Sequence, residues 1–282
     1  MKTISRFYVA LFVVIMLMSA VPLSAQEEVK PEIYVVTTMH WNLDKEDGSN
    51  EEWMALEKEY LEKVTMKNEH ILGSSYYTHM LTTDSRELMQ VEVYGSWDAI
   101  DKAGDRNAEL VQEGWPDQES RREYFQKRNS YTTTFHSDEM YNVMDQVKPF
   151  DGNAEGGMLL YMRKSKFAFP SDGSGQEFRE LYNGTVDNIV KKNEYVKGYY
   201  PSNHYYGTDR NDFIEAYFIK SLDELDKMFT KNGELAREAW PDDDARAERQ
   251  KKFQRYFTGV HSDAVYFYIS ELTKATAPPS SN

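Results

Sequence analysis

The sequence predicts an α+β protein made of two tandem copies of one βαββαβ unit. The first observation is a repeat: Trp115-Pro116-Asp117 recurs 125 residues later as Trp240-Pro241-Asp242. The same offset carries His136-Ser137-Asp138 onto His261-Ser262-Asp263. The second observation is that strand-like and helix-like patterns follow the same order in both halves. An unchanged offset without gaps is expected from about residue 33 to residue 144.

The elements of the first copy follow from side-chain spacing and from helix-start signals. A β-branched and aromatic run indicates each strand, and apolar residues at helical spacing indicate each helix. Ser96 and Ser221 are placed as N-caps, and Pro116 suits a first helical turn. The expected elements are strand 33–41, helix 51–67, strands 71–81 and 87–94, helices 97–112 and 116–129, and strand 137–144. This order is the ferredoxin-like pattern.

Two such units can hide the bare faces of their sheets by closing around each other. The result would be an intramolecular pseudo-dimeric α/β barrel with a partly polar, lined interior. On this basis, the alternating side chains of the third strand in each copy are assigned to a helix-facing side and an interior-facing side. The helix-facing residues expected are Met89, Val91, Val93, Ile214, Ala216 and Phe218. The interior-facing residues expected are Leu88, Gln90, Glu92, Tyr94, Phe213, Glu215, Tyr217 and Ile219.

The termini and the middle of the chain have compositions of their own. Lys2 and Arg6 precede an apolar run over 7–21, and small residues precede a cleavage site expected near Ala25. We therefore expect export to a bacterial periplasm or the medium. The expected divisions are a signal peptide over 1–25, a first repeat over 26–145, a linker over 146–157, a second repeat over 158–272 and a flexible tail over 273–282.

Composition excludes several classes of function. The chain has 282 residues, no cysteine and a formal net charge of −14. The absence of cysteine excludes thiol catalysis and cysteine-ligated metals. An acidic surface repels phosphate backbones and anionic lipids, so no nucleic-acid partner is expected, and no membrane partner once the signal peptide is removed.

The stretch from Val91 to Lys102, with the sequence VEVYGSWDAIDK, resembles the dimeric α/β-barrel superfamily. It is similar to the antibiotic-biosynthesis-monooxygenase-like and NIPSNAP-like branches, and the repeat implies two fused copies. The resemblance implies binding of a small molecule and cofactor-independent oxygenase chemistry. Those branches often carry a histidine within or just after this helix, but residues 104–109 and 230–234 contain none. Haem binding or degradation is therefore the less favoured alternative.

Paired histidines are the first candidates for chemistry. His79 and His204 occupy matching positions late in the second strands, among many tyrosines. Each is a candidate general base, because imidazole exchanges protons near neutral pH. The alternative is a structural histidine kept from the ancestral unit.

Two further patterns give candidate site residues. In the pairs His136/Asp138 and His261/Asp263, the one-residue spacing places both side chains on one strand face. They are interpreted as His–carboxylate pairs or as turn and cap residues, and no metal site is predicted. The expected ligand-binding residues are His40, Tyr77, Glu92, Tyr161, Arg163, Glu215 and Tyr217. His40 and Arg163 lack an equivalent in the other copy and would mark a specialised site.

These observations favour an exported protein that binds a small apolar or aromatic molecule inside the barrel. The resemblance adds cofactor-independent monooxygenase or isomerase chemistry, so the sequence leaves open whether the protein is an enzyme. A non-enzymatic envelope ligand-binding or protein-interaction module is the alternative, and a haem protein is the second. No cofactor is predicted. The chain is expected to be a monomeric pseudo-dimer or to form a higher homo-oligomer.

Overall fold

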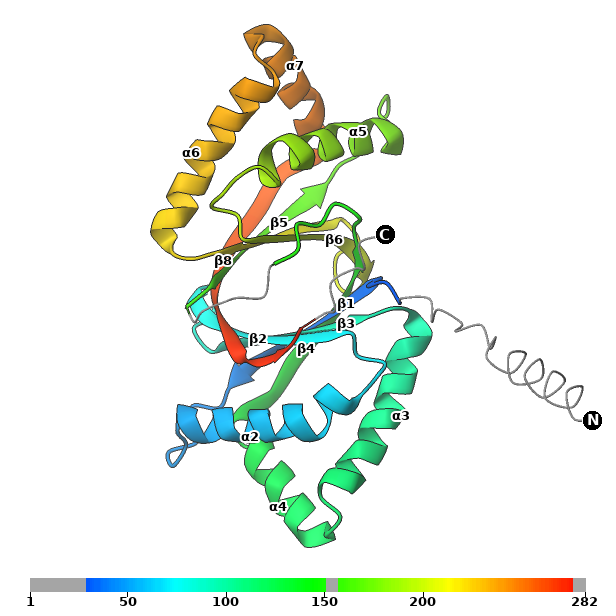
Figure 1. Cartoon of the computed structure of the whole chain (residues 1–282), viewed down its shortest axis with the longest axis vertical. Helices are drawn as coiled ribbons and strands as arrows, with labels where there is room; N and C mark the ends of the chain where they lie inside the picture. The colour runs from blue at the N-terminus through cyan, green and yellow to red at the C-terminus, as the bar shows by residue number, and fades with distance from the viewer. Residues whose placement is uncertain (1–28, 151–156, 276–282) are drawn as a thin grey trace, which may run out of the picture. The chain divides into compact units, whose positions relative to one another are not determined.

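The computed structural model describes residues 29–150 and 157–275 (Figure 1). The predicted signal peptide, the centre of the predicted linker and the end of the predicted tail lie outside these segments. From Lys30 onward the described residues form one compact unit. Within these segments, no helix combines the length and the apolar character needed to cross a membrane.

Eight strands and their helices follow one another in the same order in both halves of the described chain. The first half contains β1 (Ile33–Trp41), α2 (Asn50–Lys63), η1 (Thr65–Lys67), β2 (Gly73–Leu81), β3 (Glu87–Tyr94), α3 (Trp97–Gly114), α4 (Gln118–Asn129) and β4 (Thr132–Val143). The second half contains β5 (Leu159–Phe167), α5 (Gly175–Thr185), η2 (Val186–Val190), β6 (Gly198–Tyr206), β7 (Asp212–Ile219), α6 (Leu222–Ala239), α7 (Asp243–Gln254) and β8 (Phe257–Lys274). Thr273 and Lys274 of the predicted tail thus belong to β8.

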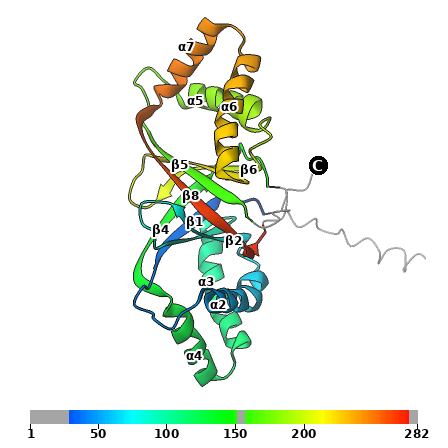
Figure 2. The ribbon, with the colours of Figure 1, turned by 90° about the vertical axis from the view of Figure 1, so that its left-hand side faces the viewer.

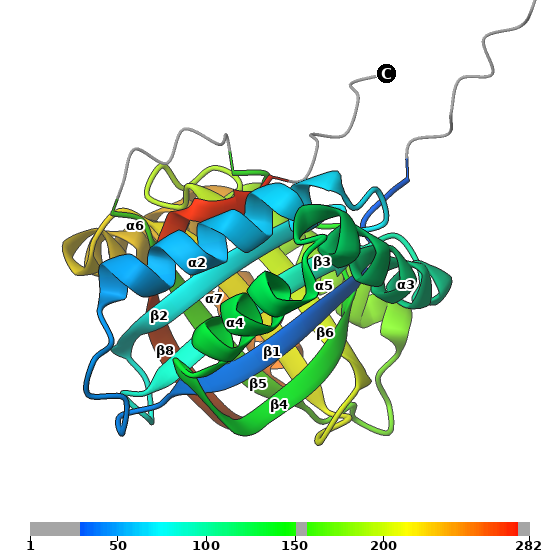
Figure 3. The same ribbon diagram turned by 90° about the horizontal axis from the view of Figure 1, so that it is seen from below.

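The strands close into one antiparallel barrel in the order β1-β3-β2-β8-β5-β7-β6-β4. Two seams join the halves: β2 pairs with β8, and β4 pairs with β6. Figure 2 shows the long β8 running alongside both β5 and β2. Helices α2 and α4 lie across the outer surface of the first-half strands (Figure 3), and α5 to α7 lie outside those of the second half. The predicted α+β barrel is confirmed.

Serine and aspartate side chains start the six α-helices. Each accepts a hydrogen bond from the backbone N–H three residues ahead, which satisfies one of the free donors of the first turn. The capping residues are Ser49, Ser96, Asp117, Ser174, Ser221 and Asp242. The predicted caps Ser96 and Ser221 are confirmed. Pro116 lies just before the cap of α4 rather than inside its first turn.

The predicted facing of the third strands is wrong. Leu88 packs with Trp53 of α2, and Phe213 and Tyr217 pack with Tyr182 of α5, so this set faces the helices. The other set, which includes Met89, Val91, Ala216 and Phe218, lies inside the barrel. Alternation separates two faces but does not say which is inner, and here both faces are apolar.

The barrel side of the sheet carries both apolar and charged side chains, in keeping with the expected partly polar interior. Lys164 Nζ lies 3.3 Å from Glu139 and 3.4 Å from Asp212. The buried apolar cluster on this side contains Tyr77, Met89, Met158, Leu160, Phe218 and Tyr266. Phe150, from the predicted linker, stacks on Phe218 with ring centroids 5.0 Å apart. Part of the predicted linker is therefore a component of the barrel core.

The expected ungapped offset of 125 residues fails at the first strand. Tyr94 pairs with Ile33, whereas Ile219, 125 residues after Tyr94, pairs with Leu159. Strand β5 therefore matches β1 with an offset of 126. This single-residue shift exchanges the two faces of the strand. His40 now aligns with Lys166 and Arg163 with Thr37, so neither has a residue of its own type in the other copy.

Candidate functional site

A row of three charged residues crosses neighbouring strands of the second half. Arg163 on β5 lies opposite Asp263 on β8 and opposite Glu215 on β7. Side chains directly opposite each other in antiparallel strands lie close together on one face. Tyr161, two residues before Arg163, packs against α5 and α6, so the row faces the helices.

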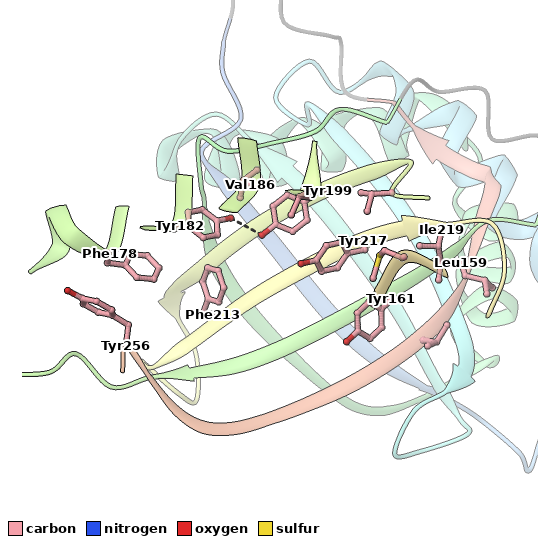
Figure 4. Close-up of a cluster of buried hydrophobic side chains, with 14 residues drawn as sticks. Leu159, Tyr161, Phe178, Tyr182, Val186, Tyr199, Phe213, Tyr217, Ile219 and Tyr256 are labelled. Carbon is pink, nitrogen blue, oxygen red and sulfur yellow. Dashed lines mark hydrogen bonds between the residues drawn. The ribbon is translucent and has the colours of Figure 1, made fainter. Parts of the chain in front are cut away.

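Aromatic side chains flank this row. Tyr161 stacks on Tyr217 with ring centroids 5.7 Å apart, and Phe229 of α6 meets Tyr161 edge-on at 5.8 Å. Figure 4 shows Tyr161, Tyr217 and Tyr199 on neighbouring strands, with Tyr182 of α5 beside Tyr199. Tyr161 and Tyr217 are buried, at 4% and 8%, whereas Phe229 is exposed, at 47%. The row thus lies beside a buried aromatic layer that one exposed ring, Phe229, contacts.

Glu215 is held by tyrosine hydroxyls. Tyr199 and Tyr217 each donate a hydrogen bond of 2.9 Å to its Oε1, and the Tyr199 and Tyr182 hydroxyls are 2.8 Å apart. Burial raises the pKa of Glu215, while the two tyrosine bonds and the charge of Arg163 oppose the shift. By surface area the residue as a whole is of intermediate exposure.

Asp263 connects the row to an exposed histidine. It accepts a 2.5 Å hydrogen bond from the Tyr161 hydroxyl, and His261 Nε2 lies 3.3 Å from its other oxygen. The predicted spacing of this His–carboxylate pair is therefore present in the structure. The pair of His136 and Asp138 in the first half is also formed, at 3.4 Å.

Arg163 is the cation at the centre of the row. In residues 29–150 and 157–275, no carboxylate oxygen lies within ion-pair distance of its guanidinium group. Burial and the bond to Asp263 raise the pKa of Tyr161, and the charge and a hydrogen bond of Arg163 oppose that shift. The planar guanidinium therefore contacts the Tyr161 hydroxyl and has further N–H donors for a carboxylate, phenolate or carbonyl oxygen.

The first half lacks this combination. The matching row contains Asp138, Thr37 and Gln90, and the Thr37 hydroxyl donates a 2.6 Å hydrogen bond to Asp138. The charged side chains below its helices are paired instead, with Arg128 2.7 Å from Glu57. The asymmetry between the halves indicates that the second half is the specialised one.

The structure divides the predicted ligand-binding residues between two faces of the sheet. Only His40 and Tyr77 lie on the barrel side. The prediction that the others line the interior is wrong, because they lie under the helices: Glu92, Tyr161, Arg163, Glu215 and Tyr217. Their role in ligand binding stays a prediction.

The paired histidines lie late in β2 and β6, on the two seams between the halves and away from the charged row. His79 faces Tyr266 across the β2–β8 seam, and His204 faces Tyr141 across the β4–β6 seam. His79 Nδ1 lies 2.9 Å from the Thr82 hydroxyl. His204 Nε2 is buried and has no hydrogen-bond partner among the described residues. Their predicted catalytic role remains a prediction.

Sequence reasoning missed three aromatic residues of the site as contributors: Tyr182, Tyr199 and Phe229. A sequence signal was present. The repeat aligns Tyr182 with Glu57 and Tyr199 with Ser74 of the first copy, so neither tyrosine has a counterpart there. In the described part of the chain, no group of three or more histidine, aspartate or glutamate side chains is placed to hold a metal ion.

Comparisons with known proteins support the fold. No protein-family model and no curated sequence matches the chain. A structure from Fusobacterium nucleatum described as a "putative monooxygenase" matches with a TM-score of 0.52 at 12% identity, over 84% of this chain and 92% of that chain. One of the same description from Lactobacillus acidophilus matches with a TM-score of 0.53 at 8% identity, over 85% and 94%. The chain therefore has the fold of the dimeric α/β-barrel superfamily, as the sequence resemblance predicted.

Proposed function

We propose that this protein binds a small planar aromatic molecule bearing an acidic oxygen, and that the site lies over Arg163 on the helix-facing side of the second half. The observation that carries the proposal is the Asp263–Arg163–Glu215 row, at whose centre the guanidinium forms no ion pair with another described residue. The proposal moves the expected binding site from the barrel interior to this row, because Arg163 and Glu215 lie on the helix-facing side.

The neighbours of Arg163 define what the ligand would meet. Tyr161 and Tyr217 form a buried, stacked pair on the same face of the sheet as Arg163, and the exposed Phe229 ring contacts Tyr161. Glu215, whose pKa is raised by burial, donates a hydrogen bond when protonated. A ligand with one ionised oxygen and a neighbouring carbonyl or hydroxyl group satisfies both residues.

The same geometry supports cofactor-independent oxygenase or isomerase chemistry. His261 is positioned by Asp263 and is exposed, so it can accept a proton from an acidic O–H or C–H of the ligand. Arg163 then stabilises the resulting anion. In an isomerase the proton returns at another carbon, and in an oxygenase the anion donates electrons to O₂.

Calorimetric titration with 1-hydroxy-2-naphthoate tests the binding step. Because hydrogen bonds to charged groups contribute about 1.5–3 kcal/mol, Arg163→Met should weaken binding about 10- to 100-fold. Arg163→Lys should restore only part of it, since lysine lacks the planar fork. Arg210→Met, at an exposed arginine of the β6–β7 turn, is the matched control and should bind normally. Equal affinities in all four proteins would refute the proposed site.

A separate readout tests catalysis. His261→Asn should lower O₂ consumption or isomerisation of an identified substrate and leave its affinity unchanged, because the histidine acts as base rather than as ligand. Unchanged turnover would exclude this role. If the ligand binds but no variant and no condition shows turnover, the non-enzymatic ligand-binding alternative holds.

The seam positions of His79 and His204 are the second candidate site. The unpartnered Nε2 of His204 and the seam tyrosine Tyr141 support a proton-transfer role there. A His79→Ala/His204→Ala double variant that folds and keeps full turnover would exclude it.

We further infer that the chain is a tandem duplication of a ferredoxin-like unit and that it is exported after cleavage near Ala25. The duplication is supported by the repeated element order and by the strand orders β4-β1-β3-β2 and β8-β5-β7-β6. Native mass spectrometry of protein recovered from the periplasm or medium tests the remaining points. We expect a monomer beginning near Gln26, and co-purified haem would instead support the haem alternative.

A further inference from the structure

Three exposed aromatic side chains gather where the two halves meet. Trp97 begins α3, and Tyr205 and Tyr206 end β6, which pairs with β4 at the seam. The Trp97 ring lies 5.5 Å from that of Tyr205 and 6.4 Å from that of Tyr206, at interplanar angles of 69° and 72°. We call Trp97, Tyr205 and Tyr206 the aromatic corner.

The corner is open to solvent. The exposed fractions are 46% for Trp97, 47% for Tyr205 and 64% for Tyr206. Rings that meet near a right angle present two faces to whatever enters the corner between them. The face of an aromatic ring carries the negative end of its quadrupole, so such a corner attracts a cation.

The β2–β8 seam shows that exposed aromatic residues are not required where the two halves join. By the repeat, Leu222 matches Trp97, while Met80 and Leu81 match Tyr205 and Tyr206. Leu222 and Leu81 are also exposed, at 39% and 55%. At the positions equivalent to the aromatic corner, the other seam therefore carries aliphatic and thioether side chains instead of rings.

Charge around the corner favours a cation as well. Asp98, in the first turn of α3 directly after Trp97, is exposed, and so is Asp101 one turn further on. Asp98 is paired with Lys102 at 2.6 Å, whereas Asp101 forms no ion pair with another described residue. The whole chain carries a formal net charge of −14, which raises the local concentration of cations.

We propose that the aromatic corner binds an organic cation of the quaternary-ammonium class, such as a trimethylammonium group. A methylated ammonium group is weakly hydrated and matches ring faces, which is why aromatic clusters recognise such ligands. This site is separate from the one around Arg163. Two or three exposed rings predict a roughly millimolar dissociation constant.

Titration of the full mature chain with choline, monitored by the NMR signal of the Trp97 indole N–H, tests this proposal. The uncharged isostere 3,3-dimethyl-1-butanol distinguishes cation binding from apolar binding. We expect saturable shifts with choline and binding of the alcohol that is at least about fivefold weaker. Trp97→Ala, monitored at the Tyr206 amide, should lose choline binding, and Trp97→Phe should keep part of it.

Leu222→Ala is the matched control, because it removes the equivalent side chain at the other seam. It should bind choline as the wild type does. Equal binding of choline and the alcohol would overturn the proposal and leave an apolar patch. Absence of a saturable shift at about 100 mM choline would overturn it too. Far-UV circular dichroism of each variant establishes that a loss of binding is not a loss of fold.

Discussion

Replacing Tyr217 by phenylalanine should destabilise the protein more at high pH than at low pH. Its hydroxyl donates a 2.9 Å hydrogen bond to Glu215, and phenylalanine keeps the ring while removing this donor. A hydrogen bond to an ionised group contributes about 1.5–3 kcal/mol, compared with about 0.5–1.5 kcal/mol for a neutral pair. The cost of Tyr217→Phe should therefore follow the ionisation of Glu215.

The direction of this pH dependence follows from the linkage between proton binding and folding. Burial raises the pKa of Glu215 in the folded state, so its contribution to stability is fully present below the unfolded pKa and is lost as pH rises through the folded value. Removing the Tyr217 donor raises that folded pKa further. The free-energy difference between wild type and variant should thus grow from about 1 kcal/mol near pH 4 to about 2–3 kcal/mol near pH 8.

Urea unfolding at both pH values measures this difference. Tyr124→Phe is the matched control, because the buried Tyr124 hydroxyl donates a 2.7 Å bond to the uncharged backbone oxygen of Leu56. Its cost should be about 0.5–1.5 kcal/mol at either pH. A cost of Tyr217→Phe that does not change with pH, or that falls as pH rises, would refute the assignment of the raised pKa to Glu215.

Three further substitutions test the packing and the charge pairs. Asp212→Asn should destabilise by about 3–5 kcal/mol in urea unfolding, because Asp212 is 2% exposed and pairs with Lys166; a loss under 1 kcal/mol would contradict this. Trp53→Ala should cost about 3–5 kcal/mol, since this side chain is 1% exposed in the first-half core; a shift in the melting temperature measures it. Gly198→Ala should cost about 1–3 kcal/mol, because a Cβ there would lie 2.9 Å from Phe150; normal stability would show that Phe150 is not part of the core.

The barrel and its helix starts could be predicted because each depends on local or periodic signals. The repeat of Trp115-Pro116-Asp117 fixed the number of units, and capping serines such as Ser96 marked helix starts. The candidate site could be predicted only in part. Arg163 was identified as an asymmetric charged residue on a strand, although it was placed on the wrong face.

Facing could not be predicted because the barrel interior and the helix-covered surface both mix apolar and charged side chains here. Met89 and Leu88 are equally buried, at 2% and 1%, on opposite faces. Glu215 suggested a polar interior, yet its carboxyl group is satisfied by tyrosine hydroxyls beneath the helices. A buried acid therefore indicates nearby donors rather than a particular side of a sheet.

The one-residue shift at β5 shows a second limit of prediction from the sequence. An offset of 125 holds for most of the repeat, but the connection from β5 to α5 is one residue shorter than that from β1 to α2, which exchanges the faces of the first strand alone. Sequence comparison of the two copies could not detect this shift, because β1 and β5 share few side chains. The pairing of Arg163 with Asp263 and Glu215 emerges only from strand register.

A crystal structure of the mature chain with bound 1-hydroxy-2-naphthoate tests the central proposal most directly. We predict that an ionised oxygen of the ligand contacts the Arg163 guanidinium and that its rings lie against Tyr161 and Tyr217. Electron density for the ligand at a seam beside His79 or His204, with Arg163 unoccupied, would contradict the account.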